Sequence, residues 1–477
     1  MTSRLRRLAL LTLALLTLFT LGAGAAVAHL LPARLARWQI ARVAGHPLAA
    51  ARPVLPAAGE PQGQAVSPGG LSGRLSGTLG LPALGAHVAA VVANLATGQV
   101  LFARDGSSPF APASTAKLAT AVAALHVLGP GARLSTRVVT GGTPSSIVLV
   151  GGGDPTLAAG RPPAADYPQP ATLASLAAKT ARALRARHRR RVRLGYDASR
   201  YAGPLLAPSW PSSYVATGNV SPITSLEADQ GRLTAGGSPQ DADDPGNFRP
   251  RSLTPAADAA RAFGAFLAMH GIRVLGPARP ARARTAGATI ASVASPPLAD
   301  IVQWMLIESN NVIAENLARQ VAITTGMPAT FSGAAAAVTA TDRKLGVRGI
   351  SLLDGSGLSP GDRITPRALV QLITLAARPD EPGLRPVITG LPVAGFSGTL
   401  APGGSVFGAA GRTALGMVRA KTGNLTRVAA LAGVAYASNG QLLGFAFMAD
   451  RVPKNGLAQA GSALDELATE LAGCGCR

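Results

Sequence analysis

The sequence predicts an α/β (α+β) sandwich, in which helices flank an antiparallel sheet and a smaller β-rich domain is inserted. The first observation is in the C-terminal third, where three apolar runs separated by short turns are typical of antiparallel strands: 417–422, 428–436 and 442–449. The second is a set of helical patterns around these runs: 297–325, interrupted near 308–311, then 332–345, 365–377 and 457–471. Helices and a sheet of this kind bury their apolar faces against each other.

The first 80 residues are expected to lie outside this fold. Arg4, Arg6 and Arg7 precede an apolar run that ends at residue 28, so 1–28 is either a signal peptide cleaved after Ala28 or a retained membrane anchor. Both alternatives remain open, and both place the rest of the chain outside the cytoplasmic membrane. Residues 29–80 are rich in Pro, Gly and Ala, and we interpret them as a linker with little core of its own.

The remaining chain divides into a domain formed by 81–132 and 289–477 and an inserted domain, 133–288. The first part of the outer domain predicts a hairpin, 87–95 and 99–104, followed by an Ala- and Leu-rich helix after Ser114. The inserted part predicts short strands and two helices: 136–140, 147–150, 173–187, 192–196 and 255–270. Its Gly-rich stretch at 151–155 lacks the Lys-Ser/Thr of a phosphate-binding loop and is interpreted as a turn.

Charge and cysteine content narrow the function only slightly. The net charge is +22 and comes almost wholly from arginine, which suits a cell-wall polymer, a membrane surface or nucleic acid, or simply keeps the surface soluble. The Arg-rich stretch 185–193 is by default a solvated helix end, and we expect no nucleic-acid partner for an exported chain. Cys474 and Cys476 give no disulfide framework and no metal site, and a local disulfide and two free thiols both remain open.

Ser114-x-x-Lys117 at the start of a helix is the clearest chemical signal. Lys117 lies three residues after Ser114 and therefore on the same helix face. A serine hydroxyl becomes a nucleophile only when a base takes its proton, and lysine is such a base only when desolvation or a nearby cation lowers its pKa. The pattern predicts a serine acyltransferase with a lysine base.

Two more patterns follow in order, Ser309-x-Asn311 and Lys421-Thr422-Gly423, which completes the motif set of penicillin-binding proteins and serine β-lactamases. Each is weak alone, but the chain has only five lysines, so their joint occurrence is informative. The predicted catalytic residues are Ser114, Lys117, Ser309, Asn311 and Lys421, and the predicted substrate-binding residues are Thr422, Gly423 and Asn424. Ser309 would pass the proton to the leaving amine, Asn311 would orient Lys117, and Lys421 with Thr422 would hold a terminal carboxylate. Backbone N–H groups of Ser114 and Asn424 are the expected oxyanion donors.

The chain resembles the D-alanyl-D-alanine carboxypeptidase/endopeptidase family, the low-molecular-mass class C penicillin-binding proteins. Flanking stretches at 151–157, 354–359 and 395–400 are similar to that family, and the long gap between Ser114 and Ser309 fits its inserted domain. The resemblance implies a β-lactamase/transpeptidase-like fold and a serine D-Ala-D-Ala carboxypeptidase, with DD-endopeptidase activity as a further expectation. It implies peptidoglycan stem peptides as substrates and β-lactams as covalent inhibitors. The departures are Asn310, where the family often has Asp, and Asn424, where it usually has Thr.

Two other functions remain as alternatives, a β-lactamase and a non-catalytic cell-wall-binding protein. No Glu stands in the local pattern by which class A β-lactamases activate water, which favours the peptidase. The expected reaction needs neither a metal nor an organic cofactor. Residues 8–28 are the expected membrane contact if the N-terminal segment is retained.

Overall fold

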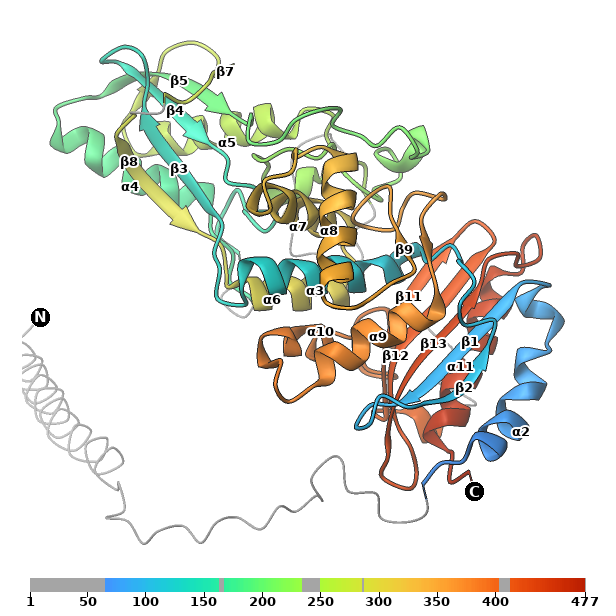
Figure 1. Cartoon of the computed structure of the whole chain (residues 1–477). Helices are drawn as coiled ribbons and strands as arrows, with labels where there is room; N and C mark the ends of the chain where they lie inside the picture. Colours follow the sequence, from blue (N-terminus) through green and yellow to red (C-terminus); the bar gives the residue numbers. More distant parts are fainter. Residues whose placement is uncertain (1–64, 163–166, 234–248, 285–286, 403–411, 477) are drawn as a thin grey trace, which may run out of the picture. The chain divides into compact units, whose positions relative to one another are not determined.

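The central element is a five-stranded antiparallel sheet in the order β11-β12-β13-β1-β2. The computed structural model describes residues 65–162, 167–233, 249–284, 287–402 and 412–476 (Figure 1). The strands are β1 (Val88–Asn94), β2 (Val100–Arg104), β11 (Val418–Leu425), β12 (Val428–Tyr436) and β13 (Leu442–Ala449). The three predicted C-terminal strands and the N-terminal hairpin are confirmed, and β11, which carries Lys421, lies at the edge of the sheet.

Successive residues of β1 face opposite sides of the sheet, and each side is covered by helices. Ala90 and Val92 pack with α2 (Pro68–Leu79) and α11 (Leu457–Ala472), whereas Ala89 and Val91 pack with a larger helical layer. That layer consists of α3 (Lys117–Leu128), α6 (Leu298–Ile307), α7 (Asn311–Thr324), α8 (Phe331–Lys344), α9 (Pro366–Ala377) and α10 (Arg385–Thr389). The predicted sandwich of helices around an antiparallel sheet is therefore present.

Helix α2 corrects the predicted linker over 29–80. Leu71, Leu75 and Leu79 follow one another at four-residue spacing and are fully buried against the sheet. Ser67 caps the helix by accepting a hydrogen bond from the N–H of Gly70 (3.0 Å). The interpretation as a linker was wrong for these residues because glycines weaken the helical signal, while the leucine stripe supplies enough burial to stabilise the helix.

The inserted region contains a six-stranded sheet in the order β6-β5-β4-β3-β8, with β7 beside β5. Its strands are β3 (Ser135–Thr140), β4 (Ser146–Val150), β5 (Arg191–Asp197), β6 (Arg273–Val274), β7 (Arg279–Pro280) and β8 (Thr289–Ala294). Helices α4 (Leu173–Ala186) and α5 (Pro255–Met269) pack on one face (Figure 1). Because β8 pairs with β3, residues 289–294 belong to this sheet, and the predicted boundary at 288 is too early.

A long irregular stretch, 198–233, leaves the inserted sheet and packs on α7 and α8. Tyr201 and Trp210 lie in one apolar cluster with Val312 and Phe331. The prediction of a separate domain over all of 133–288 is therefore wrong for this stretch. It has no helical or strand periodicity, so no local pattern indicates that its aromatic side chains anchor it to the helical layer.

The two ends of the chain differ in what the structure describes. The predicted signal peptide or anchor, 1–28, and most of the predicted linker lie outside the described residues. Within the described ranges, no helix has the length and hydrophobicity needed to cross a membrane. At the C-terminus Cys474 and Cys476 form a local disulfide, which answers the question that the sequence left open.

Candidate active site

Ser114 lies in a short 3-10 turn, η2 (Ala113–Ala116), that leads directly into α3. The predicted helix therefore begins at Lys117, and Ser114 is in the turn just before it. Ala113 has a positive φ of 47°, a strained conformation for a residue with a side chain. Ser114 is partly buried and Lys117 is fully buried.

The amine of Lys117 contacts three oxygen atoms. Its Nζ lies 2.8 Å from Ser114 Oγ, 2.6 Å from Asn311 Oδ1 and 2.8 Å from the carbonyl oxygen of Ser356. A neutral amine has two N–H donors and one lone pair. When the amine is neutral and donates to Asn311 and Ser356, its lone pair is left for the hydroxyl of Ser114, which is the arrangement that a base needs in order to accept its proton.

Burial lowers the pKa of Lys117 to about 7, although the carboxyl groups of Asp354, Glu315 and Asp362 act in the opposite direction. Burial, and then the charge of Lys117, also hold the pKa of Lys421 well below its usual range. Desolvation thus supplies a neutral amine near physiological pH.

The Ser356 carbonyl is held by a tight loop around Asp354. The two carboxylate oxygens of Asp354 accept hydrogen bonds from the N–H groups of Ser356, Gly357 and Ser359 and from Trp210 Nε1, at 2.7–3.0 Å. Gly357 has φ 83°, and a Cβ there would lie 1.9 Å from the carbonyl oxygen of Ala113. The loop therefore needs glycine in order to approach the Ser114 turn.

The second motif lies between α6 and α7, as predicted. Ser309 has a positive φ of 55°, and Asn310 caps α7 by accepting a hydrogen bond from the N–H of Ile313. The amide of Asn311 has one orientation, because Nδ2 donates to the carbonyl oxygen of Asn219 (2.8 Å) while Oδ1 faces Lys117. Asn310 is thus a helix cap in this chain.

Strand β11 brings the third motif to the same place. A Cβ on Gly423 would lie 2.6 Å from the carbonyl oxygen of Pro112 and 3.2 Å from the N of Thr115, so only glycine lets the strand approach the Ser114 turn this closely. Lys421 Nζ donates to the carbonyl oxygen of Thr422 (2.9 Å). The hydroxyl of Thr422 donates to Thr399 Oγ1 (2.9 Å), while Asn424 is exposed at the edge of the sheet.

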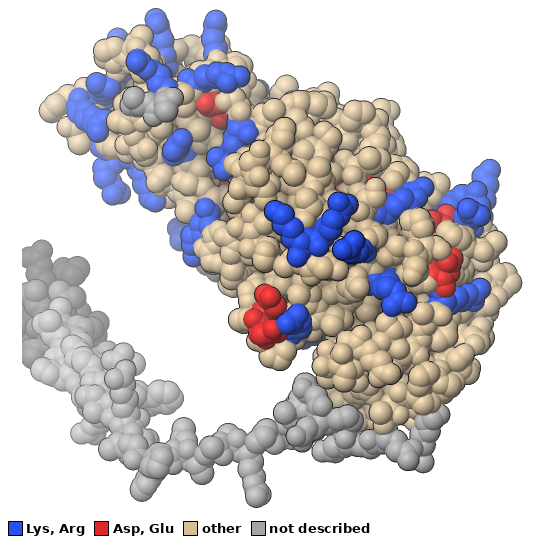
Figure 2. Space-filling view, viewed as in Figure 1, with Lys and Arg blue, Asp and Glu red and all other residues tan. Residues whose placement is uncertain are grey.

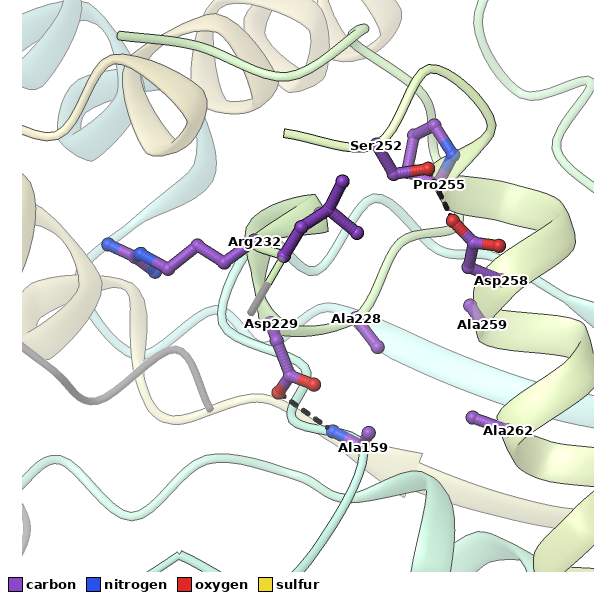
Figure 3. A pocket seen from close by; sticks show the side chains of 11 residues that line it. Ala159, Ala228, Asp229, Arg232, Ser252, Pro255, Asp258, Ala259 and Ala262 are labelled. Carbon is purple, nitrogen blue, oxygen red and sulfur yellow. Dashed lines mark hydrogen bonds between the residues drawn. The ribbon is translucent and has the colours of Figure 1, made fainter. Parts of the chain in front are cut away.

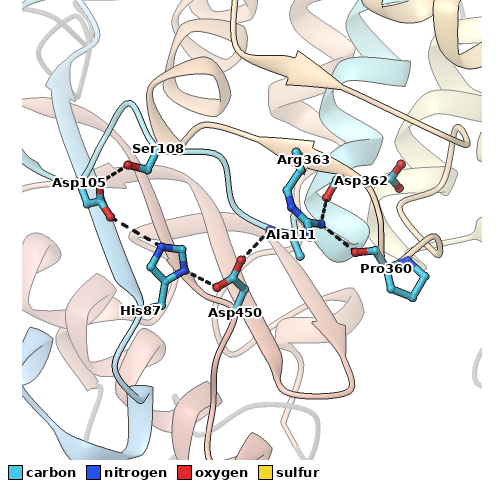
Figure 4. A network of polar contacts seen from close by, with 8 residues as sticks. All are labelled: His87, Asp105, Ser108, Ala111, Pro360, Asp362, Arg363 and Asp450. Atoms are coloured by element: carbon cyan, nitrogen blue, oxygen red, sulfur yellow. Dashed lines mark hydrogen bonds and ion pairs between the residues drawn. The ribbon is translucent and has the colours of Figure 1, made fainter.

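Behind the Ser114 turn, a polar network fixes the chain that leads into it (Figure 4). Asp450 bonds the imidazole of His87 with one carboxylate oxygen and accepts from the N–H of Ala111 (3.1 Å) with the other. The His87 ring also stacks on Phe110, with 4.0 Å between ring centroids. Residues 110 and 111 are thereby fixed three to four positions before Ser114.

Arg251 is a buried residue that sequence reasoning missed. Its guanidinium donates through Nε and Nη2 to the carbonyl oxygen of Gly218 (3.1 and 3.0 Å) and through Nη1 to that of Gln230 (3.1 Å). Gly218 adjoins Asn219, the acceptor for Asn311, and the side chain of Gln230 accepts from Asn310 Nδ2 (2.8 Å). One guanidinium therefore joins the two loop segments that hold both asparagines of the second motif.

The loop with Gln230 is also fixed from the side of α5 (Figure 3). Asp229 accepts a hydrogen bond from the N–H of Ala159 (3.0 Å), and Ser252, next to Arg251, donates to Asp258. Asp229 and Gln230 both have positive φ values, 53° and 52°. Two consecutive left-handed residues persist only where the surroundings impose them, so this loop is held in one shape.

We expect Arg251→Lys to lower the rate of acylation by penicillin about tenfold, because lysine keeps the charge but cannot donate to both carbonyls at once. In an Asn311→Ala background the same change should have little further effect, since Arg251 acts through the Asn311 amide. Stopped-flow acylation kinetics on the four proteins measure this coupling. The control is Arg261→Lys, an exposed arginine on α5. Additive losses in the double variant would show general weakening of the fold instead.

The structure brings Ser114, Lys117 and Asn311 into direct contact and places Lys421, Thr422 and Gly423 beside them. Ser309 adjoins Asn310 and Asn311 at the end of α6. Sequence reasoning missed the supporting groups Asn219, Gln230, Arg251 and Asp354. The similarity of 354–359 to the family was a signal for the last of these, whereas the others carried none.

Comparisons with known proteins agree with this geometry. The sequence profile of the D-Ala-D-Ala carboxypeptidase 3 (S13) family matches residues 71–247 and 233–471. Carboxypeptidase Rv3627c of Mycobacterium tuberculosis is 38% identical over 418 residues, which cover 86% of this chain and 85% of that protein. Carboxypeptidase DacB of Mycolicibacterium smegmatis is 37% identical over 412 residues, 85% of each chain.

Among solved structures, penicillin binding protein 4 of Haemophilus influenzae has the same fold. It superposes with a TM-score of 0.67 at 22% identity and covers 84% of this chain and 97% of its own. The family profile spans the segments that carry all three motifs. On this evidence the chain belongs to the D-Ala-D-Ala carboxypeptidase 3 (S13) family.

Proposed function

We propose that this protein is a serine D-Ala-D-Ala carboxypeptidase that acts outside the cytoplasmic membrane on peptidoglycan stem peptides, through an acyl-enzyme on Ser114. The observation that carries the proposal is the buried amine of Lys117, in contact with Ser114, Asn311 and the Ser356 carbonyl. Membership of the family and its carboxypeptidase relatives support the substrate class.

In the acylation step, Lys117 accepts the proton of Ser114 as Oγ attacks the carbonyl carbon of the penultimate D-Ala. The N–H groups of Ser114 and Asn424 stabilise the oxyanion of the tetrahedral intermediate. The C–N bond then breaks, and the proton passes from Lys117 through Ser309 to the nitrogen of the departing D-Ala. A water molecule hydrolyses the ester in the second half-reaction, with the same base accepting its proton.

Lys421 and Thr422 provide the recognition of the terminal carboxylate. A carboxylate next to Lys421 favours its charged form and offsets the desolvation that now holds its pKa low. β11 is an edge strand, and among the described residues only its first part, 418–420, forms backbone hydrogen bonds with a segment outside the sheet, 392–394, so the part that follows can pair with an extended peptide. The same geometry suits a β-lactam, which presents a carboxylate and a reactive amide, so we expect β-lactams to acylate Ser114.

The test is intact-mass spectrometry of the full chain after incubation with benzylpenicillin, beside release of D-Ala from a pentapeptide. We expect a stable adduct of one penicillin and free D-Ala. Rapid hydrolysis of the drug without an adduct would identify a β-lactamase. Unmodified protein with intact drug and no D-Ala would identify a non-catalytic wall-binding protein.

We expect the second-order rate of acylation by benzylpenicillin to rise with pH up to about 7 and then to level off. Below the pKa of Lys117 the amine is protonated and has no lone pair for the Ser114 proton, so the rate should fall about tenfold per pH unit. Above that pKa the base is neutral and the rate is constant. Acylation measured between pH 5 and 9 tests this, and a rate that still rises tenfold per pH unit at pH 9 would mean that burial does not lower the pKa of Lys117.

A further inference from the structure

The inserted sheet has one face without helices, and arginine side chains lie along it. Side chains that alternate along the strands face α4 and α5, among them Val192 and Leu194 of β5. The intervening residues of β5, Arg191 and Arg193, point to the other face and are exposed. In Figure 1 the helices lie behind this sheet, so its helix-free face is in view.

The register of the strands adds further arginines to this face. Arg273 of β6 is directly opposite Arg191, and Arg279 of β7 is opposite Gly195, two residues beyond Arg193. The loop after β7 crosses the sheet at Gly195, where a Cβ would meet the side chain of Ala281 at 2.8 Å. We define the arginine face as seven exposed arginines: four on β5, β6 and β7, two in the loop after β7, and one on β3. In chain order they are Arg137, Arg191, Arg193, Arg273, Arg279, Arg282 and Arg284.

Among the described residues, carboxylates that would balance this charge are scarce. No arginine of the arginine face is in an ion pair with another residue of the described ranges. Asp197, on which the charge of Arg282 acts, is buried, and its oxygens accept from the N–H groups of Ser199 and Ala283. Figure 2 shows Lys and Arg side chains gathered over this end of the protein with few acidic neighbours.

Such an arrangement costs stability, because like charges placed directly opposite on neighbouring strands repel each other. A surface that only had to stay soluble would gain by mixing both signs of charge. Arginine also has a planar fork of donors that matches the oxygens of a phosphate. Along a strand these forks repeat about every 7 Å, on strands about 5 Å apart.

We propose that the arginine face binds a linear phosphate polymer attached to the cell wall and so holds the enzyme near its peptidoglycan substrate. This proposal rests on the proposed function in one respect, that the enzyme works at the cell wall. A polymer fits better than a membrane, since Val139 and Val148, two apolar side chains of β3 and β4 on this face, are buried, and Val150 is partly buried. It also fits better than single-stranded nucleic acid, which needs exposed aromatic side chains on which its bases can stack. The large exposed aromatic side chains among the described residues are Tyr167 and Phe396, and neither belongs to a strand of this sheet.

The experiment compares the parent protein with the triple variant Arg191→Gln/Arg193→Gln/Arg273→Gln. Binding of the full chain to long-chain polyphosphate is measured by calorimetry at several salt concentrations. We expect at least a tenfold loss of affinity in the triple variant. The slope of log K against log salt should fall by about two, since three phosphate contacts are lost.

The matched control removes the same charge from three separate exposed sites, Arg74→Gln/Arg343→Gln/Arg451→Gln, on α2, on α8 and after β13. We expect this control to keep most of the affinity. An equal loss in both triple variants would show that net charge alone attracts the polymer and would overturn the proposal. Tighter binding to vesicles of 30% phosphatidylglycerol in phosphatidylcholine, or to single-stranded DNA, would overturn it in favour of that partner.

Isolated bacterial walls give a second measurement. The parent protein should co-sediment with walls more than the triple variant does, and the difference should vanish once hydrofluoric acid has removed phosphodiester-linked polymers. Acylation by benzylpenicillin should be the same for parent, triple variant and control. Failure of acylation in the parent would refute the proposed function and leave the binding result standing, so the two failures are distinguishable.

Discussion

Ser114→Ala is expected to reduce both acylation by benzylpenicillin and release of D-Ala by about 10⁴-fold or more. The variant keeps Lys117, Asn311 and Lys421 but removes the hydroxyl oxygen that lies 2.8 Å from Lys117 Nζ. Loss of the nucleophile in other serine hydrolases has an effect of this order or larger, because the remaining site still binds and polarises the substrate but cannot form the ester. Single-turnover kinetics and intact mass measure the loss.

The control for this prediction is Ser76→Ala, which removes an exposed hydroxyl from α2. It should leave acylation unchanged. The thermal midpoint of Ser114→Ala should stay within a few degrees of the parent, because one side-chain contact of a partly buried hydroxyl is lost. A covalent penicillin adduct on the Ser114→Ala protein would refute the assignment of the nucleophile.

Lys117→Met is expected to lower the acylation rate by about 10³-fold, within the range that general bases contribute. Methionine has a similar length and suits a buried site, but it has no lone pair that can take the Ser114 proton. The rise of the rate up to about pH 7 should also disappear, since the titrating group is gone. Acylation kinetics between pH 5 and 9 measure both effects, with exposed Lys344→Met as the control.

Lys421→Met separates the roles of the two buried lysines. Burial lowers the pKa of Lys421 as well, so the pH dependence alone does not identify the base. If Lys421 binds the substrate carboxylate, its loss should raise KM more than it lowers kcat and leave the limb near pH 7 in place. If the rise of the acylation rate up to about pH 7 persisted in Lys117→Met and was lost in Lys421→Met, Lys421 would be the base instead of Lys117.

Much of the fold could be predicted because its elements carry strong local periodicity. The three C-terminal strands, the helices at 297–325 with their break near 308–311, and the closing helix follow alternation or helical spacing, and the structure places them within a few residues of the prediction. Helix α2 was missed because its glycines mask the leucine stripe, and the boundary at 288 was missed because pairing of β8 with β3 joins segments about 150 residues apart.

The motifs likewise predicted a group of catalytic side chains from their residue types and order alone. Ser114 and Lys117 are three residues apart, so local helical geometry alone brings them together. Asn311 and Lys421 could be placed beside them only through the order of known motifs. Tertiary structure then supplied the contacts between Lys117 and Asn311, 194 residues apart, and between Lys117 and Ser356, 239 residues apart.

By itself, the sequence determined the residue types of the site, its family and the layered arrangement of helices on an antiparallel sheet. Only the tertiary structure decided which oxygens contact the Lys117 amine, that burial lowers its pKa, and that Arg251 and Asn219 hold the second motif. The physical reason is that backbone carbonyls hold these side chains in place and that exclusion of water lowers the pKa of Lys117. Every residue has a carbonyl, and burial belongs to the assembled core, so neither leaves a local pattern in the sequence.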